Sequence, residues 1–418
     1  MNPSFLSRLS FILVLPFTLL AHEGQTPQLI TMDYADLVTI RGELAAKDSN
    51  VQPAYSQLLE YADKLLDIVP PSVMDKTMVP PSGDKHDFFA IGNYSWPNPD
   101  TKNGLPYIRR DGHKNPGATD GTFDKQRYDQ NAGRIKILAL AWFYSRDEKY
   151  AAKAADLLRT WFLDPETRMN PNLNFAASQP GVQDGSFYGI IEGVQLIGVV
   201  DHVKLLNGSA SWTDADDQGL KKWFADFTVW LRESEFGKTE LARPNNHGTW
   251  CAAQIAAYSL YSNHPENIAP MIARGRELVA HQIAPDGSLP EELRRSRSLM
   301  YSCFALRALM TLARCGELAG DDLWHYRTED GRGLENAFTF LAPYLSNTKV
   351  WTWPSLDNDL PRYAKVEILR WPARVYQTPV LKDALNILDP VWNPEIVESL
   401  SAADKESWTI WLVGPLPR

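Results

Sequence analysis

Apolar residues recur every three to four positions through most of the chain from about residue 126 onward. This spacing places them along one side of a helix, and Gly, Pro, Asn or Asp residues separate the successive runs. Alternation typical of strands is scarce. The amphipathic runs cover residues 126–147, 148–163, 186–206, 217–234, 247–262, 268–283, 296–315 and 334–346. Successive antiparallel helix pairs of this length predict an all-α fold, an incomplete (α/α) toroid with two helix rings around a cleft.

Residues 68–125 do not follow this pattern. They are rich in Pro, Gly, Asn and Asp and include "NYSWPNPDTKNGLPYIRRDGHKNPGATDG". A long irregular segment in a compact domain commonly has a function of its own. It is expected to be either a lid over the cleft or a structural strap around the barrel.

The N-terminus has the organisation of a secretory signal peptide. Arg8 precedes an apolar run from Leu9 to Leu20, which ends at Ala21. Such a run is too short to span a membrane and is typical of a cleaved leader. We therefore expect residues 1–21 to be a signal peptide, and residues 22–418 to be a single toroid domain that is periplasmic or extracellular and has no membrane contact after cleavage.

Charge and composition exclude several classes of function. The formal net charge of −9 argues against a nucleic-acid partner, which requires a broad basic surface. The three cysteines, Cys251, Cys303 and Cys315, lie in apolar helical contexts and are expected to be buried free thiols. No CxxC or HExxH motif occurs, so we expect neither a metal nor another cofactor. A monomer is expected.

Two polar clusters interrupt the apolar pattern. In "ARPNNHGTW", Asn245, Asn246 and His247 stand where a loop becomes a buried helix, a position suited to binding an anion. In "GSLPEELRRSRSLMYSCFAL", the residues 294, 297 and 301 are spaced to share one face of a continuous helix. They are two arginines and a tyrosine, and this face is predicted to lie opposite the first cluster.

Amides, an imidazole, arginines and a tyrosine suit β-elimination in a polyuronate. The carbon-5 proton of a uronate is weakly acidic, and the negative charge that develops on its removal must be stabilised by positioned donors. A tyrosine whose pKa is lowered by nearby cations can accept that proton. Glycoside hydrolysis needs two positioned carboxylates, and neither cluster centres on an acid pair.

The two motifs together resemble the alginate lyase superfamily of helical-toroid polysaccharide lyases. Members carry N-N-H-x-x-W and then L-P-x-E-L, arginines and a tyrosine, which match "NNHGTW" and "LPEELRRSRSLMY" here. "WFLDPETRMNPNLNFAASQPG" and "GIIEGVQLIGVVD" are similar to polysaccharide lyase family 38, the glucuronan- and alginate-cleaving branch. Family 5 is a more distant resemblance, since the spacing from Pro290 to Tyr301 is one residue shorter than in that family. The resemblance spans roughly residues 90–310.

This resemblance implies a role for each matching residue. Asn246 and His247 would neutralise the substrate carboxylate, and Tyr301 would accept the proton and return it to the leaving oxygen. Arg294 would lower the tyrosine pKa or hold the carboxylate. Supporting or alternative roles fall to Arg295, Arg297, Glu240 and Asn245. Candidate substrate contacts are Asn174, Gln179, Tyr94, Trp96, Arg109, Arg110 and His113.

The expected substrate is an anionic polysaccharide, either glucuronan or mannuronate-rich alginate. In both polymers the carbon-5 proton and the carbon-4 oxygen lie on one face of the ring, so a single tyrosine suffices for syn elimination. Two other functions remain open. One is a glycoside hydrolase of uronate oligosaccharides on the same toroid, and the other is a non-catalytic periplasmic polyuronate-binding protein.

Overall fold

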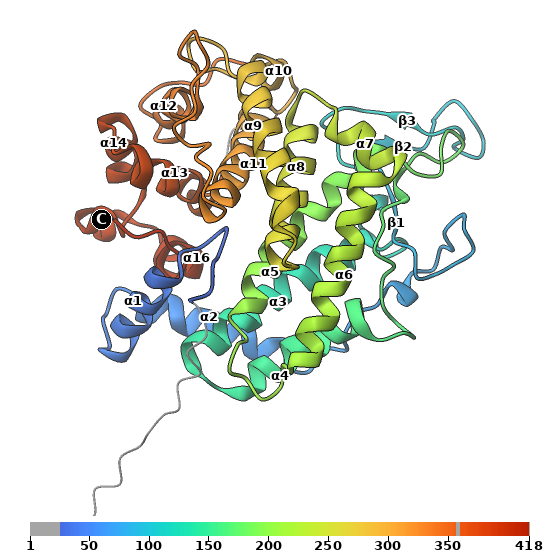
Figure 1. Cartoon of the computed structure of the whole chain (residues 1–418), viewed down its shortest axis with the longest axis horizontal. Coiled ribbons are helices and arrows are strands. Elements are labelled where there is room, and N and C mark those ends of the chain that lie inside the picture. The colour runs from blue at the N-terminus through green and yellow to red at the C-terminus, as the bar shows by residue number, and fades with distance from the viewer. Residues whose placement is uncertain (1–25, 357–359, 418) are drawn as a thin grey trace, which may run out of the picture.

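The computed structural model describes residues 26–356 and 360–417, so the expected signal peptide lies outside the described residues. The predicted all-α incomplete toroid is confirmed (Figure 1). Antiparallel helices pack in sequence, with α3 against α4 and α5, and α8 against α6, α9 and α11. Their bounds are α3 Lys125–Ser145, α4 Glu148–Leu158, α5 Gln195–Lys204, α6 Asp214–Glu233, α7 Glu235–Leu241, α8 Asn246–Tyr261, α9 Ile268–Gln282, α10 Pro290–Leu293 and α11 Ser298–Leu318.

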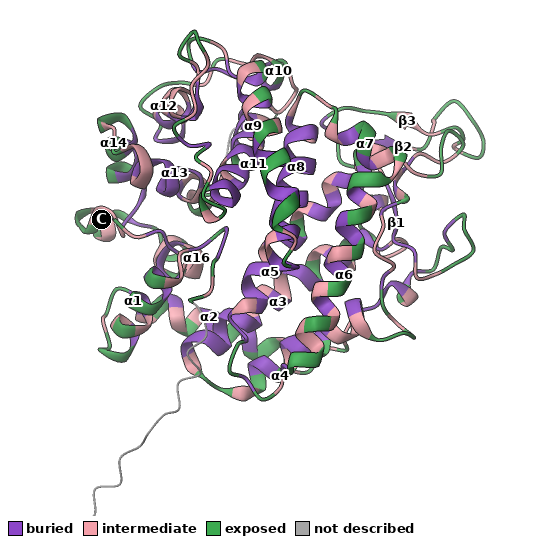
Figure 2. Ribbon diagram, viewed as in Figure 1, coloured by how far each residue is buried: buried purple, intermediate pink, exposed green. Residues whose placement is uncertain are grey.

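Helix α8 is the central element of the core. From Gly248 to Ser259 every residue is buried. Its small side chains in "WCAAQIAAYSL" allow neighbouring helices to approach closely, and α6, α7, α9 and α11 all contact it. In Figure 2 the buried residues accordingly concentrate on α8 and on the inward faces of the helices around it. The start of α8 is therefore fixed by packing on several sides.

Local sequence signals explain where several helices begin. The Asp147 side chain accepts a hydrogen bond from the Lys149 backbone N–H at the start of α4. Thr213 and Asp216 form a reciprocal capping box at the start of α6. Ser234 ends α6 and caps α7 by accepting from the Gly237 N–H. Side-chain acceptors of this kind satisfy N–H groups that have no partner inside the helix.

Helices at both ends of the described chain flank the central pairs. They are α1 Tyr34–Ala45, α2 Gln52–Lys64, α12 Leu334–Leu345, α13 Arg362–Tyr376, α14 Pro379–Leu388, α15 Ala402–Glu406 and α16 Trp408–Trp411. Both α15 and α16 pack on α2, so the two ends lie side by side (Figure 1). In the segment that precedes α1, the N–H groups of Ile30 and Thr31 donate to the buried Asp201 carboxylate. Arg314 donates to the carbonyl of Leu29, which fixes the first described residues inside the fold.

The irregular segment 68–125 is fastened to the body by short strands and a buried ion pair. Strand β1 (Phe89–Ile91) pairs in parallel with β4 (Phe175–Ser178), and β2 (Ser95–Trp96) pairs antiparallel with β3 (Ile108–Arg109). Lys76 and Asp124 form an ion pair of 2.9 Å in which both side chains are fully buried. Short helical turns complete the structure: η1 Val73–Asp75, η2 Pro116–Ala118, η3 Arg159–Leu163, η4 Phe187–Val194, η5 Pro265–Asn267 and η6 Pro394–Ser399.

The cysteine prediction is confirmed, because Cys251, Cys303 and Cys315 are all buried and free. Burial raises the pKa of each of these thiols. No helix in residues 26–356 or 360–417 is long and apolar enough to cross a membrane. The buried apolar side chains of this part of the chain form one continuous cluster that extends from Leu29 to Leu412.

Candidate active site

His247 lies in the first turn of α8 and is held by a buried carboxylate. Its Nδ1 lies 2.5 Å from Oε1 of Glu240, whose side chain on α7 is 0% exposed. Asn245 caps the helix by accepting a hydrogen bond from the His247 backbone N–H at 3.2 Å. The contact with Glu240 fixes the orientation of the ring and leaves Nε2 for a ligand.

The glycine that follows His247 is required by close packing. A Cβ atom on Gly248 would lie 1.9 Å from the carbonyl oxygen of Arg243. Two residues further along, Trp250 packs on Phe304 of α11, with ring centroids 5.0 Å apart. The "NNHGTW" motif therefore encodes a helix cap, a histidine held by Glu240, a close backbone contact and a connection to the neighbouring helix.

Asn246 is buried and hydrogen-bonded to a second carboxylate. Its Nδ2 donates to Oε1 of Glu292 at 2.7 Å, while its Oδ1 has no hydrogen-bond partner in the described part of the chain. Burial raises the pKa of the Glu292 carboxyl, against the opposing effects of this hydrogen bond and of the positive charge on Arg295. One amide hydrogen of Asn246 is thus already used by the protein.

The raised pKa of Glu292 makes a prediction about stability. A carboxyl group whose pKa is higher in the folded than in the unfolded state stabilises the fold while it is protonated. That contribution is lost as pH rises from the ordinary value of 4.5 through the folded-state pKa. Glu292→Gln does not ionise and can still accept from Asn246. We therefore expect its melting temperature, relative to wild type, to be higher at about pH 7 than at about pH 4. Thermal unfolding followed by circular dichroism measures this, and an equal difference at both pH values would contradict it.

The second motif does not form one continuous helix. Helix α10 ends at Leu293 and α11 begins at Ser298, so the prediction that Arg294, Arg297 and Tyr301 share a helical face is wrong. The intervening backbone pairs instead with a distant segment. The N–H of Ser298 donates to the carbonyl of Pro354, and the carbonyl of Ser296 accepts from the N–H of Leu356. These long-range bonds explain the interruption.

The interruption changes which arginine lies beside the tyrosine. Arg294 is exposed and forms an ion pair with Glu291, with 72% of its side chain accessible. The guanidinium of Arg295 lies 3.8 Å from the centroid of the Tyr301 ring and forms an ion pair of 3.0 Å with Asp111. Arg297 donates to the carbonyl of Gly112. Arg295 thus places its guanidinium on the Tyr301 ring, whereas the Arg297 backbone carbonyl accepts from the Tyr301 N–H.

Tyr301 also meets a second tyrosine. The hydroxyl oxygens of Tyr94 and Tyr301 lie 3.0 Å apart, and either can donate. Burial and this hydrogen bond raise the pKa of Tyr301, and the nearby charge of Arg295 only partly offsets them. The expectation that neighbouring cations lower this pKa below its ordinary value is therefore wrong for the ligand-free protein, because desolvation outweighs the single adjacent guanidinium.

The irregular segment contributes one wall of the site. Asp111 forms ion pairs with both Arg109, at 3.1 Å, and Arg295. The Arg109 guanidinium lies 6.0 Å from the ring centroid of Tyr188, and Tyr188 packs edge-on against His247 at 5.4 Å. These contacts form a connected set from the His247 imidazole to the Tyr301 phenol.

The other predicted substrate contacts lie in or next to the β2–β3 hairpin and in the loop of residues 170–183. Trp96 Nε1 donates to the carbonyl of His113, and the guanidinium of Arg110 lies 5.1 Å from the Trp96 ring. Gln179 Nε2 donates to the carbonyl of Tyr107, which ties the two segments together. Asn174 accepts from Trp230 Nε1 at 3.0 Å. None of these bonds joins the residue directly to His247 or Tyr301.

Sequence reasoning missed three residues of the site. Tyr188 and Asp111 lie far along the chain from both motifs, and no local pattern signals them. Glu292 is the E of L-P-x-E-L, but no role was assigned to it from the sequence. Its place in the L-P-x-E-L motif, two residues after Pro290, was the available signal.

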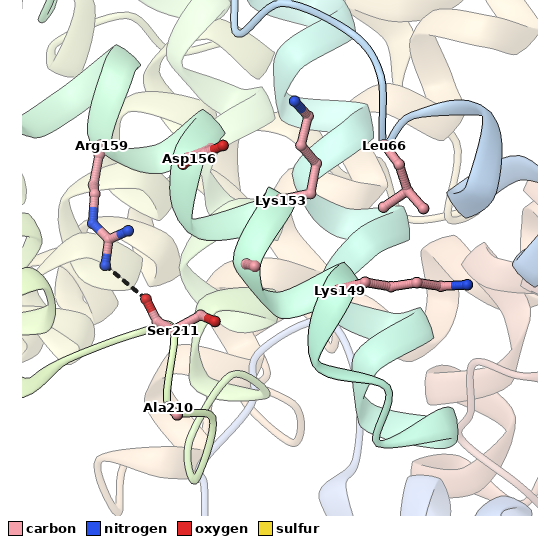
Figure 3. Close-up of a pocket in the computed structure, with 8 residues that line it drawn as sticks. Leu66, Lys149, Lys153, Asp156, Arg159, Ala210 and Ser211 are labelled. Carbon is pink, nitrogen blue, oxygen red and sulfur yellow. Dashed lines mark hydrogen bonds between the residues drawn. The ribbon is translucent and has the colours of Figure 1, made fainter.

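The metal-ligating residues and the surface hollows limit what the site can hold. In the described residues, no group of three or more His, Cys, Asp or Glu side chains is placed to hold a metal ion. A surface hollow of about 610 Å³ lies on α4 and is lined by Lys149, Lys153, Arg159 and their neighbours (Figure 3). Lys149 is paired with Asp63 and Arg159 with Asp216, while Lys153 donates to the Ile68 carbonyl. The hollow includes no residue of the candidate site.

Comparison with known proteins places the chain among the α/α-toroid polysaccharide lyases. The family model described as alginate lyase matches residues 72–351, which is more than half of the chain. The chain therefore belongs to the alginate lyase family. This range contains every residue assigned above to the candidate site.

Individual relatives agree with this assignment. The crystal structure of an alginate lyase from Bacteroides ovatus superimposes with a TM-score of 0.82 at 31% identity, covering 92% of this chain and 99% of that one. Alginate lyase A1-III from Sphingomonas species A1 superimposes with a TM-score of 0.55 at 16% identity, which shows a shared fold. The alginate lyase of Pseudomonas syringae pv. tomato is 30% identical over 112 residues, so the match spans 26% of this chain and 28% of that relative.

Proposed function

We propose that the protein cleaves a 1,4-linked polyuronate by β-elimination without a metal and leaves 4,5-unsaturated uronate ends. The observation that carries this proposal is Tyr301, whose ring lies under the Arg295 guanidinium and whose hydroxyl lies beside the Tyr94 hydroxyl. His247, oriented by Glu240, supplies a second polar group connected to it through Tyr188 and Arg109. Membership of the alginate lyase family supports the same chemistry.

The proton transfers follow from the positions of these groups. In the proposed reaction His247, with Asn246 behind it, binds the uronate carboxylate, so that the charge developing on carbon 5 spreads onto a neutralised group. The Tyr301 phenolate then takes the carbon-5 proton. The electron pair of that C–H bond forms the double bond between carbons 4 and 5, and the bond from carbon 4 to the glycosidic oxygen breaks. The proton returns from Tyr301 to the departing oxygen, which regenerates the phenolate.

Deprotonation of Tyr301 to the phenolate is the unfavourable step, because the pKa of Tyr301 is raised in the ligand-free protein. Two neighbours can stabilise it once it forms. Tyr94 can donate its hydroxyl hydrogen to the phenolate across the 3.0 Å contact, and Arg295 places a full positive charge at the ring. We infer that Arg295, rather than Arg294, has this role.

The substrate preference follows from using one acid–base residue. In glucuronate and mannuronate the proton leaves from the same ring face as the leaving oxygen, so Tyr301 can serve both steps in a syn elimination. We propose glucuronan or mannuronate-rich alginate as substrate, in keeping with the resemblance to polysaccharide lyase family 38. In guluronate the two groups lie on opposite faces, and a second residue is needed.

A substrate panel tests the proposal. The purified protein is incubated with glucuronan, polymannuronate, polyguluronate and pectate, and the ultraviolet absorbance of the conjugated product is followed. We expect the absorbance to rise fastest with glucuronan or polymannuronate. New reducing ends without any absorbance change would indicate hydrolysis, and polymer binding without either signal would indicate a binding protein.

The reaction is also expected to survive removal of metal ions. N–H donors of His247 and Asn246 replace the cation that other lyases use to neutralise the carboxylate, since no zinc or calcium motif occurs in the sequence. Activity after treatment with EDTA and gel filtration should match that of the untreated enzyme. A complete loss that calcium restores would show that the neutralising group is a metal ion.

We further propose that the protein is exported and works as a monomer in the periplasm or outside the cell. The basic and apolar N-terminal residues support export. Fractionation of the producing cell, with sequencing of the mature N-terminus, should find a chain that begins near His22. Intact Met1 in the cytosolic fraction would contradict this.

A further inference from the structure

Four aromatic side chains gather at the surface beside α12. Phe340 and Tyr344 lie on that helix with partly exposed side chains, and Trp351 and Trp353 lie in the segment that follows it. Ring centroids are 5.8 Å apart for Phe340 and Trp353, 5.1 Å for Tyr344 and Trp351, and 4.8 Å for the two tryptophans. All four rings are only partly buried, so the cluster presents apolar ring surface to solvent.

A hollow of about 280 Å³, which we call the α12 pocket, adjoins these rings. It is lined by Asp286, Asn336, Thr339, Phe340, Tyr344 and Lys349. The Oδ1 atom of Asn336 is buried and has no hydrogen-bond partner among the described residues. The turn at Gly287, where φ is +86°, packs so closely on α12 that a Cβ there would lie 2.2 Å from the Asn336 carbonyl oxygen. The position of Asp286 relative to α12 is therefore fixed.

The pocket is connected to the candidate active site through the segment 351–356. Trp351 Nε1 donates to Ser298 Oγ at 2.8 Å, at the first residue of α11. The backbone of Ser296 accepts from Leu356, and its hydroxyl donates to Asp111. The same short stretch of chain that carries Arg295 thus supports the aromatic cluster.

We propose that the α12 pocket binds a further uronate unit of the same polysaccharide chain, at a distance from the bond that is cleaved. This inference rests on the proposed function. Sugar rings pack their C–H faces on aromatic side chains, and the exposed Lys349 can bind a uronate carboxylate. The Thr339 hydroxyl, whose hydrogen is shared with the Glu335 and Asn336 carbonyls, can still accept a hydrogen bond from a sugar hydroxyl group.

Charge fixes the direction in which a uronate would lie in the pocket. Hydrogen bonds from Ser288 lower the pKa of Asp286, so its carboxylate is anionic at neutral pH. It accepts from sugar hydroxyls and repels a carboxylate, which directs the carboxylate of the sugar toward Lys349. A neutral polysaccharide gains nothing from Lys349, so the pocket is expected to favour an anionic chain.

The alternative is that the rings form a small apolar cluster that only stabilises the fold. The two accounts differ in their dependence on substrate length. A remote binding unit improves binding of chains long enough to reach it and leaves short chains unaffected. A structural cluster affects stability, and any effect on kinetics is the same for both lengths.

Steady-state kinetics with a uronate trimer and with the long polymer of the same composition test the proposal. The variants are Lys349→Gln, Trp353→Ala and, as a matched control, the exposed Lys382→Gln on α14. We expect the first two to raise KM about three- to tenfold for the polymer only, with kcat unchanged, as for a partly screened charged contact. The control should match wild type. Equal KM values for wild type and Lys349→Gln on the polymer, or equal changes on trimer and polymer, would overturn the proposal.

Binding measurements separate this inference from the proposed function. Calorimetric titration of long polyuronate into the Tyr301→Phe protein, with and without Lys349→Gln, requires no turnover. Weaker binding in the double variant supports the pocket, whereas unchanged affinity overturns it. If the wild-type protein releases no unsaturated product from any polyuronate, the proposed function fails whatever the calorimetric result. Because Lys349 is a surface side chain, its substitution leaves a folded protein to measure even if Trp353→Ala unfolds.

Discussion

Tyr301→Phe is expected to lower kcat at least ~10²-fold while the protein remains folded and continues to bind polymer. The substitution removes one hydroxyl oxygen, which is the atom proposed to accept the carbon-5 proton. The ring stays under the Arg295 guanidinium, so packing and the cation–π contact are kept. Initial rates from the absorbance of the unsaturated product, together with a thermal unfolding curve, measure both parts of the expectation.

Tyr94→Phe is the matched control for this experiment. It removes the other hydroxyl of the 3.0 Å pair and keeps Tyr301 itself. We expect a smaller loss of kcat than for Tyr301→Phe, because Tyr94 only stabilises the phenolate. If Tyr301→Phe retains most of its turnover, or if guluronate blocks prove the best substrate, the single-tyrosine mechanism is wrong. His247 then becomes the leading candidate for the base.

Arg295→Ala is expected to reduce kcat/KM by about 10²-fold or more, whereas Arg294→Ala should be close to wild type. Loss of a charge placed where negative charge develops typically has an effect of this size. Arg295 contacts the Tyr301 ring and Asp111, whereas Arg294 is exposed and forms an ion pair with the exposed Glu291. The two residues are adjacent and of the same type, so each variant is the control for the other.

The pH profile adds a readout that a structural role would not change. Arg295 opposes the rise in the pKa of Tyr301. If the phenolate is the active form, removal of Arg295 should therefore move the onset of activity to a higher pH. The opposite ranking, with Arg294→Ala the more damaging variant, would show that the 294–297 loop rearranges when substrate binds.

The fold and the first motif were predictable because their signals are local. Apolar spacing along single helices predicted the toroid, and the polar residues before the run that starts at Trp250 predicted a functional helix start. The helices outside these runs, among them α1, α2, α7 and α13 to α16, were not predicted. The apolar residues of α1 are interspersed with charges in "YADLVTIRGELA", so its amphipathic pattern is weak.

The second motif was only partly predictable, because tertiary contacts override local helix periodicity between Arg294 and Arg297. The residues from Glu291 to Tyr301 include no proline or glycine, so nothing local marks the interruption. The backbone there is bonded to Pro354 and Leu356, more than fifty residues further along the chain. These tertiary bonds determine which of the two adjacent arginines lies on Tyr301. The sequence alone therefore identifies neither that arginine nor Asp111 as the partner of Arg295.

The pairing of Tyr94 with Tyr301 joins residues 207 positions apart, and the Leu29 carbonyl meets Arg314 over 285 positions. Contacts between such distant parts of a chain form slowly during folding, since a large loop must close before they gain any energy. During synthesis the helices from α3 to α6 can pair while the ribosome is still adding α11. The reactive centre, by contrast, cannot assemble until nearly three quarters of the polypeptide has emerged. Catalytic competence is therefore one of the last properties that the nascent chain acquires.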